Sequence, residues 1–288
     1  MTLFTVTFIV SVLVFGLVAA VYFLSAGQGG ESSDSTHAGA PEAKTADSMN
    51  ILLIIKPEEE DRRKDLYILT RYDFKDKTVP VISLPRNSVC AVGGVSRTLT
   101  EHFDYGGLVQ LKTAVQALYK TSVHRTMEMS AETFENIIDK FGGLAFDVPK
   151  DAELDGGDSL VNIETGYQTL TGVMAGQLML WAANDPQDLM PARLISAFHN
   201  QYLSAETLQN AQSLYEYVSG QTKTDFSYAD LVRILPDMEL IAPFESPSEA
   251  MPVSGNEQSG GFSPDETMLA AVQNRFGGAD TPIVSGVS

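Results

Sequence analysis

Two side chains of opposite charge, Asp65 and Arg86, stand where predicted strands begin and end, so they are the first candidates for ionic chemistry. Asp65 precedes the β-forming run 66–72, and Arg86 follows Pro85, which ends the returning strand 78–84 because proline lacks a backbone donor. A guanidinium holds phosphate or carboxylate oxygens two at a time, so the pair would suit an anionic ligand. The same spacing fits a structural ion pair, which is the simpler interpretation of these two residues alone.

The elements that must position this pair are three strands. Residues 50–55 are a short continuous apolar run, typical of a strand buried on both faces. The charged stretch 56–64 follows and is predicted to be a solvated loop or the lip of a cleft. Residues 73–77 have the composition of a turn, so the two later strands should pair in antiparallel fashion.

Helical spacing of apolar residues predicts the remaining elements. One helix is expected over 108–120, after the paired glycines at 106–107. Another is expected from Ser130, whose hydroxyl suits an N-cap, to the stop signal at Gly142. Further helices are predicted over 190–202, 205–218 and 228–235, and a strand over 144–148.

The N-terminus carries a segment, residues 4–24, without any charge. About 20 apolar residues are needed to cross a bilayer as a helix, so this segment can span. A cleaved signal peptide is the alternative, but the apolar run is long for one and no basic region precedes it. We therefore predict a transmembrane anchor over 1–25 and, because residues 26–48 are rich in Gly, Ser and Ala, a flexible tether after it.

Composition limits the compartment and the partners. The chain has 288 residues and a net charge of −18, which argues against a nucleic-acid partner because such a partner requires a basic face. The one cysteine, Cys90, excludes an internal disulfide framework. We expect one folded domain over 49–242 and a disordered acidic tail over 243–288, with one short helix in the tail near 264–275.

Six short motifs in order make the chain similar to a known family. They are Asn50–Leu53, Arg63–Asp65, Ser83–Arg86, Phe103–Gly107, Phe141–Leu144 with Asp147–Pro149, and Gly166 with Leu170–Gly172. In this order and spacing, over residues 50 to about 235, the chain resembles the LytR-CpsA-Psr family of bacterial envelope proteins.

The resemblance implies a fold, an activity and a location. The expected fold is α/β in three layers, with a mixed central sheet, helices on both faces and an apolar tunnel for a lipid. The implied activity is a phosphotransferase reaction that moves glycopolymers from a polyprenyl-pyrophosphate lipid to peptidoglycan with Mg²⁺ and clustered arginines. The implied location is the cell membrane, with a single-pass anchor and the domain outside.

The family's polar residues carry over in part. By resemblance, Arg86 and Asp65 would be catalytic, with Asp65 also the metal ligand, and Arg63 would bind ligand. Arg193, one helical turn from an expected position, and Arg97, as part of a relocated site, are further ligand-binding candidates.

Other family positions hold different residues. An expected carboxylate falls at Pro57, and an expected acid at Asn87. The Arg-x-Arg pair falls at Leu180 and Ala182, and the next arginine and glutamine fall near Met190 and Pro191. Each charge-assisted contact contributes roughly 1.5–3 kcal/mol, so losing several guanidiniums would cost many powers of ten in rate.

Two hypotheses follow. The favoured one is a relative with weak or no catalysis that binds a lipid, a glycopolymer or another envelope protein. The alternative is a fully active transferase with a relocated site that uses Arg86, Asp65, Arg63 and one of Arg97 or Arg193. A transcriptional regulator, an older label for this family, has no support in the sequence.

Overall fold

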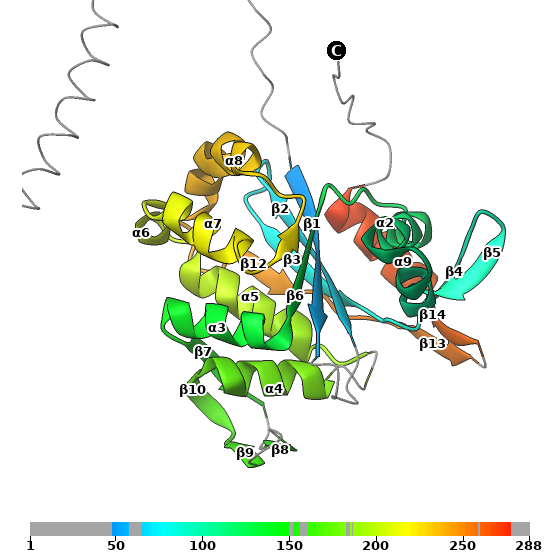
Figure 1. Ribbon diagram of the computed structural model, residues 1–288, viewed down its shortest axis with the longest axis horizontal. Coiled ribbons are helices and arrows are strands. Elements are labelled where there is room, and N and C mark those ends of the chain that lie inside the picture. Colours follow the sequence, from blue (N-terminus) through cyan, green and yellow to red (C-terminus); the bar gives the residue numbers. More distant parts are fainter. Residues whose placement is uncertain are drawn as a thin grey trace, which may run out of the picture. The chain divides into compact units, whose positions relative to one another are not determined.

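A mixed six-stranded sheet lies at the centre of the protein (Figure 1). The computed structural model describes residues 48–57, 65–149, 152–155, 160–182, 185, 187–258 and 260–277. The predicted anchor over 1–25, nearly all of the predicted tether over 26–48, and Arg63 lie outside the described residues. Within the described part of the chain, no helix combines the length and apolar character that a membrane span requires.

The strand order of this sheet is β11-β6-β1-β2-β3-β12. The strands are β1 (Ser48–Lys56), β2 (Leu66–Asp73), β3 (Val79–Leu84), β6 (Arg125–Ser130), β11 (Lys223–Thr224) and β12 (Ser248–Ala250). β1 pairs in parallel with β6 and antiparallel with β2, β2 pairs antiparallel with β3, and β3 pairs in parallel with β12. The C-terminal ends of β1, β3 and β6 therefore lie at the same edge of the sheet.

Both faces of the sheet are covered, because side chains of a strand alternate between faces. On one face, Ile55 and Ile68 join the core formed with α3 (Ala131–Phe141), α4 (Gly172–Ala182) and α5 (Met190–Tyr202). On the other face, Leu52 and Tyr67 pack with α2 (Leu99–Tyr119) and α9 (Glu266–Phe276). The apolar run in β1 is thus buried on both sides, as predicted, and the three-layer α/β fold class is confirmed.

A third group of helices covers the end of the sheet where β1 begins. It consists of α6 (Ala205–Leu208), α7 (Ala211–Ser219) and α8 (Tyr228–Ile241). Ile234 and Ile241 of α8 pack against Met49 of β1 and Val79 of β3. Small two-stranded sheets complete the described fold: β4 (Val89–Val92) with β5 (Val95–Thr98), β7 (Leu144–Val148) with β10 (Gly166–Leu170), β8 (Ala152–Asp155) with β9 (Leu160–Ile163), and β13 (Gly255–Gln258) with β14 (Gly261–Pro264).

Local signals placed several helix ends correctly. The Ser130 hydroxyl accepts a hydrogen bond from the Thr133 amide at the start of α3, and the helix stops at Gly142, whose φ is 99°. The predicted helix over 108–120 is wrong at its start. It begins at Leu99, where Thr98 and Glu101 form a capping box, and the paired glycines kink the helix instead of preceding it.

Two helices predicted near residues 205–235 also differ. The stretch predicted as one helix over 205–218 is two, α6 and α7, because Asn210 takes a non-helical φ of −104° with ψ of 12°. The helix predicted to end at residue 235 continues to Ile241 through Pro236. The last turn of α8 stays helical because this places the side chain of Ile241 in the core under the helix.

The prediction of a disordered tail over 243–288 is wrong for the part of the tail that the structure describes. Residues 248–250 form β12, an edge strand of the central sheet, and the short helix expected in the tail is α9, which begins at Glu266. Met268, Val272 and Phe276 of α9 are buried against α2. Three apolar side chains suffice here because the helix does not form its own core but completes an existing one. The folded unit therefore extends past residue 242, to Phe276.

Candidate functional site

A polar pocket lies at the sheet edge where β1, β3 and β6 end. Its volume is about 130 Å³, and its lining comes from four separate parts of the chain: Asp65, Leu66, Ser83, Leu84, Pro85, Arg86, Asn87, Ala182, Asp185, Pro191 and Glu257. The C-terminal ends of parallel strands are the usual binding position in open α/β sheets. The fold therefore places the predicted pair, Asp65 and Arg86, in one pocket at that position.

Arg86 is held by the loop between β3 and α2. The Ser88 amide donates to the Pro85 carbonyl at 2.9 Å, which closes a turn just after the strand. The Thr100 amide and hydroxyl both donate to the Arg86 carbonyl, at 3.0 and 3.2 Å. The first turn of α2 thus fixes the backbone from which the guanidinium projects.

Asp65 is a partly buried carboxyl at the entry to β2. Burial raises the pKa of Asp65 above its ordinary value; Lys56 opposes this rise and Asp104 adds to it, Glu128 adds a smaller effect, and Arg86 opposes. Asp65 and Arg86 therefore act on each other through the pocket. Among the described ion pairs none joins Asp65 to Arg86.

The other two described candidates lie away from this pocket. The Arg97 guanidinium lies over the Tyr105 ring, 4.2 Å from its centroid. Arg193 lies over the Phe146 ring at 5.2 Å and donates from Nη2 to the Asp147 carbonyl at 3.3 Å. The structure thus brings Asp65 and Arg86 together and leaves Arg97 and Arg193 outside the pocket lining.

Sequence reasoning missed two carboxylates that line the pocket. Asp185 follows the end of α4, where the sequence indicated only a break in the chain. Glu257 comes from β13, and both its oxygens accept hydrogen bonds from Asn87 Nδ2, at 3.0 and 3.2 Å. Nothing near Glu257 in the sequence signals this role, because the residue reaches the pocket only through the pairing of β13 with β14.

One wall of the pocket is apolar at positions where the family resemblance predicts polar groups. Ala182 and Pro191 line the pocket directly. Leu180 is 1% exposed and belongs to the core under the sheet. Among the described lining residues Arg86 is therefore the one cation, and it is surrounded by Asp65, Asp185 and Glu257.

Asp65, the metal ligand that the family resemblance predicts, lines the polar pocket. No group of three or more His, Cys, Asp or Glu side chains in the described chain is arranged to hold a metal ion. Pro57 offers no side-chain donor at the position where the family resemblance expects a carboxylate. Mg²⁺ in proteins is commonly held by one or two carboxylates together with waters or phosphate oxygens, and Asp65 could supply one such carboxylate in the polar pocket.

Two apolar cavities lie between the sheet and the helices α3, α5 and α7. The larger, about 240 Å³, is lined by Ile51, Leu53, Thr70, Tyr72, Met127, Met129, Phe134, Ile137, Ile138, Phe141, Ile195, Phe198, His199 and Val218. The smaller, about 210 Å³, is lined by side chains around α7 and α8. Met127 and Val218 line both cavities, so the two are neighbours.

One polar pair interrupts the apolar wall of the larger cavity. The Tyr72 hydroxyl and His199 Nε2 are 2.8 Å apart. Burial lowers the pKa of His199 to about 4 and raises the pKa of Tyr72 to about 12, so both side chains are neutral at pH 7. The cavity wall therefore carries no charge among its lining residues.

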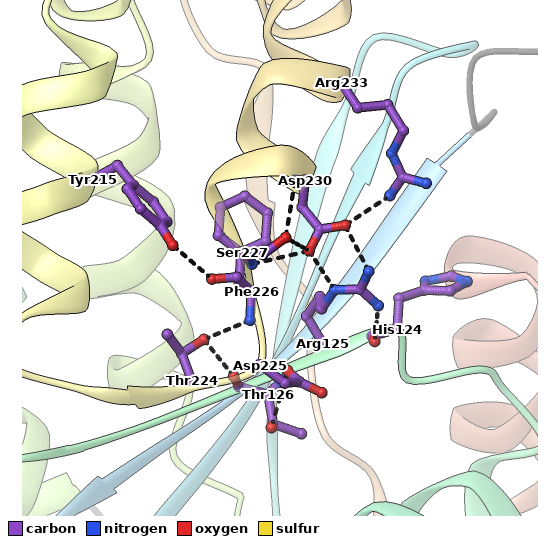
Figure 2. Close-up of polar contacts among 10 residues, drawn as sticks. All are labelled: His124, Arg125, Thr126, Tyr215, Thr224, Asp225, Phe226, Ser227, Asp230 and Arg233. Atoms are coloured by element: carbon purple, nitrogen blue, oxygen red, sulfur yellow. Dashed lines mark hydrogen bonds and ion pairs between the residues drawn. The ribbon is translucent and has the colours of Figure 1, made fainter. Parts of the chain in front are cut away.

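A partly buried ion pair holds α8, which lines the smaller cavity, against β6. Figure 2 shows the Asp230 carboxylate of α8 between Arg125 of β6 and Arg233. Arg125 donates to it twice, from Nε at 2.8 Å and from Nη2 at 2.6 Å. The Ser227 amide and hydroxyl also donate to it, at 2.9 and 2.8 Å. Burial opposes ionisation, but these donors keep the pKa of Asp230 below its ordinary value.

Comparison with known proteins agrees with this architecture. The model of the LytR_cpsA_psr family matches residues 20–276. An uncharacterized protein of Staphylococcus aureus (strain NCTC 8325 / PS 47) is 26% identical over 119 residues, which are 40% of this chain and 29% of that protein. The chain thus matches less than a third of that relative's length.

Three solved structures have a similar fold. TagV of B. subtilis gives a TM-score of 0.66 at 18% identity, over 80% of this chain and 95% of that one. TagT bound to LIIa-WTA gives 0.64 at 20% identity, over 87% of this chain and 98% of that one. A transcriptional regulator from Enterococcus faecalis gives 0.64 at 17% identity, over 80% and 86%. At these identities the similarity concerns the fold alone.

Proposed function

The chain belongs to the LytR_cpsA_psr family, and from that premise we propose that it acts in cell-wall glycopolymer attachment with weak or no catalysis of its own. In this proposal the protein is anchored in a bacterial cell membrane by residues 1–25, and its folded domain lies outside. Its partners are a polyprenyl-linked glycopolymer and peptidoglycan. It binds the lipid-linked polymer and holds it near the wall.

The fold supports a lipid-binding role through its cavities. A polyprenyl chain is apolar along its length, and the two neighbouring cavities have almost entirely apolar walls. Burying such a chain contributes roughly 25 cal/mol per Å² of apolar surface. The neutral state of His199 keeps the wall free of charge, which avoids the cost of burying an ion beside a lipid.

The apolar wall of the polar pocket carries the proposal of weak catalysis. A pyrophosphate has several negative charges, and its cleavage requires cations that hold those charges in the transition state. Ala182 and Pro191 occupy the wall where the family resemblance predicts a guanidinium and another polar side chain, and Arg86 is left with three carboxylates around it. This pocket would therefore bind a single phosphate group, and only weakly.

The alternative is an active phosphotransferase, and one observation favours it: Arg86 and Asp65 do share a pocket. A partly buried carboxyl whose pKa is raised holds its proton more readily than an ordinary aspartate and could donate it to a leaving group, and Arg86 is suited to hold a leaving phosphate. Arg97 and Arg193 do not assist it, since both are engaged elsewhere.

The test compares binding with turnover on the same lipid. The native protein and Arg86→Ala are mixed with a polyprenyl-pyrophosphate-linked sugar and Mg²⁺, and both bound lipid and released phosphate are measured. We expect the native protein to bind the lipid with little turnover, and the variant to bind about equally. Substantial turnover that disappears in Arg86→Ala would establish the phosphotransferase instead. Failure to bind the lipid would remove the glycopolymer role altogether.

A further inference from the structure

Helix α8 presents a row of exposed apolar side chains at every fourth residue. The row consists of Tyr228, Val232, Pro236 and Leu240, and it continues with Phe244 just after the helix. The exposed fractions of its four large members are 44% for Tyr228, 53% for Val232, 52% for Leu240 and 49% for Phe244. Each step of four residues turns about 40° around the helix, so the side chains from Tyr228 to Leu240 form a strip that winds over about a third of its circumference. We call this strip the α8 row.

The orientation of the row is fixed by the rest of the helix. Ile234 and Ile241 on the opposite side are buried in the core, at 3% and 0% exposure. The Asp230 carboxylate is bound twice by Arg125 of β6. The helix therefore cannot roll to bury the row, and these apolar side chains stay exposed to solvent.

The row lies at the end of the sheet where the described chain begins and ends. The buried side of α8 contacts Met49 at the start of β1. Asn50 Nδ2 donates to the Phe276 carbonyl at 2.9 Å, so the last turn of α9 is at this end too, as Figure 1 shows. The polar pocket lies at the other end of β1, roughly 25 Å away by the length of a nine-residue strand.

The segment preceding β1 in the sequence indicates what this end faces. Residues 4–24 carry no charge and are long enough to cross a bilayer. Residues 25–47 join that segment to Ser48, so the chain enters the described fold at the end that carries α8. In the proposed membrane location, the covalent link to the anchor raises the local concentration of lipid, so even a weak contact between α8 and the bilayer would be populated.

The row also adjoins the apolar cavities. The Tyr228 ring packs against the Tyr215 ring, with centroids 5.6 Å apart. Tyr215 lines the cavity of about 210 Å³. The exposed strip therefore adjoins the wall of this cavity through the contact of two tyrosines.

The charges around the row are of both signs with a small acidic excess, and the whole chain carries −18. The exposed cations are Lys75, Lys77 and Arg233. The exposed carboxylates are Asp76, Glu239 and Glu245, and Asp237 is half-buried. Lys77 Nζ lies 5.7 Å from the centroid of the Phe244 ring. This end of the molecule is thus suited to an electrically neutral lipid surface, where the apolar and aromatic side chains of the row supply the attraction.

We propose that the α8 row docks on the surface of the lipid bilayer, with its aromatic side chains at the headgroup level. Tyrosine and phenylalanine beside lysine are typical of such interfaces. The proposal rests on the proposed membrane location and adds to it a defined face. Docking directs the cavity mouth at α7 and α8 to the bilayer and the polar pocket to the wall.

The test uses the full-length protein in phosphatidylcholine vesicles that contain a lipid with a quenching doxyl group. A fluorophore is attached to Leu240→Cys and, as a matched control, to Tyr167→Cys, whose native side chain is 79% exposed on β10, far from α8 in Figure 1. The native Cys90 is buried, so brief labelling modifies the introduced thiol. We expect quenching at position 240 to be at least twofold stronger than at 167.

The outcomes separate the two proposals. If the protein floats with the vesicles and both labels are quenched equally, docking is wrong and the membrane location stands. If the protein does not float, the membrane location fails and docking fails with it. Disulfide cross-linking of two copies through position 240 would assign the row to a second copy of this chain. Val232→Cys repeats the measurement one turn earlier if Leu240→Cys does not fold.

Discussion

Replacing Asp230 by asparagine should destabilise the protein more than any other single charge removal on α8. The Asp230 side chain is 8% exposed, and it accepts two hydrogen bonds from Arg125 and two from Ser227. The Arg125 side chain is 26% exposed and stays partly solvated, so the cost of losing its partner is nearer the roughly 1.5–3 kcal/mol of a charge-assisted hydrogen bond than that of a fully buried pair. Asparagine keeps one acceptor oxygen for the helix cap, so we expect a loss of about 1.5–3 kcal/mol in the free energy of unfolding.

The assay is urea unfolding at pH 7, followed by circular dichroism. The matched control is Glu239→Gln, the same loss of one negative charge on an exposed position of the same helix, which should change stability by at most about 0.5 kcal/mol. A double-mutant cycle with Arg125→Met should give a coupling energy of about 2 kcal/mol. A loss below about 1 kcal/mol for Asp230→Asn, or a coupling near zero, would refute the view that this pair holds α8 in place.

Three further predictions concern pH, charge and close packing. Burial lowers the pKa of His199 to about 4, from an unfolded value near 6.5. The native state therefore binds fewer protons than the unfolded state, and the free energy of unfolding should fall by at most about 3 kcal/mol as the pH drops from about 6.5 to 4. Urea unfolding of the native protein and His199→Gln at each pH measures this. Glu257→Gln removes one pocket carboxylate and should tighten binding of inorganic pyrophosphate about tenfold, measured by calorimetry. Gly172→Ala should cost about 3 kcal/mol, measured by urea unfolding, because its Cβ would lie 2.0 Å from the Glu135 carbonyl.

Each of these has a matched control. His199→Gln should reduce the acid loss of stability while leaving the part due to His124, whose pKa burial also lowers to about 4; equal slopes would contradict the assignment. Glu266→Gln, an exposed charge in the first turn of α9, should leave pyrophosphate binding unchanged. Gly260→Ala, where a Cβ meets nothing within 4 Å, should cost little; a loss equal to that of Gly172→Ala would contradict the packing argument.

Sequence reasoning succeeded where the signal lay within a few residues. Pro85 ends β3 and Gly142 ends α3 because a missing donor and a left-handed backbone act locally. Asp65 and Arg86 were predicted as a pair because both flank the same antiparallel hairpin. The family motifs then predicted the three-layer fold, which the structure has.

Sequence reasoning failed where the structure depends on partners far along the chain. β12 has only three residues, Ser248–Ala250, without a β-forming pattern of their own. It is a strand because it pairs with β3, while Ser248 bonds to Asn200 and to Ser196 of α5. Glu257 entered the pocket by the same route. Such contacts leave no trace in composition, which is why the segment looked disordered.

The position of β12 has a consequence for biosynthesis. The edge of the sheet beside β3 is completed by residues 248–250, and α9, near residue 276, covers the face beneath α2. Until these residues have been synthesised, β3 presents unpaired backbone groups and part of the core is exposed to water. The nascent chain can therefore form incorrect strand pairs. The domain can close only when nearly all of it has been made, and a gene shortened at residue 242 would encode a product that never reaches that state.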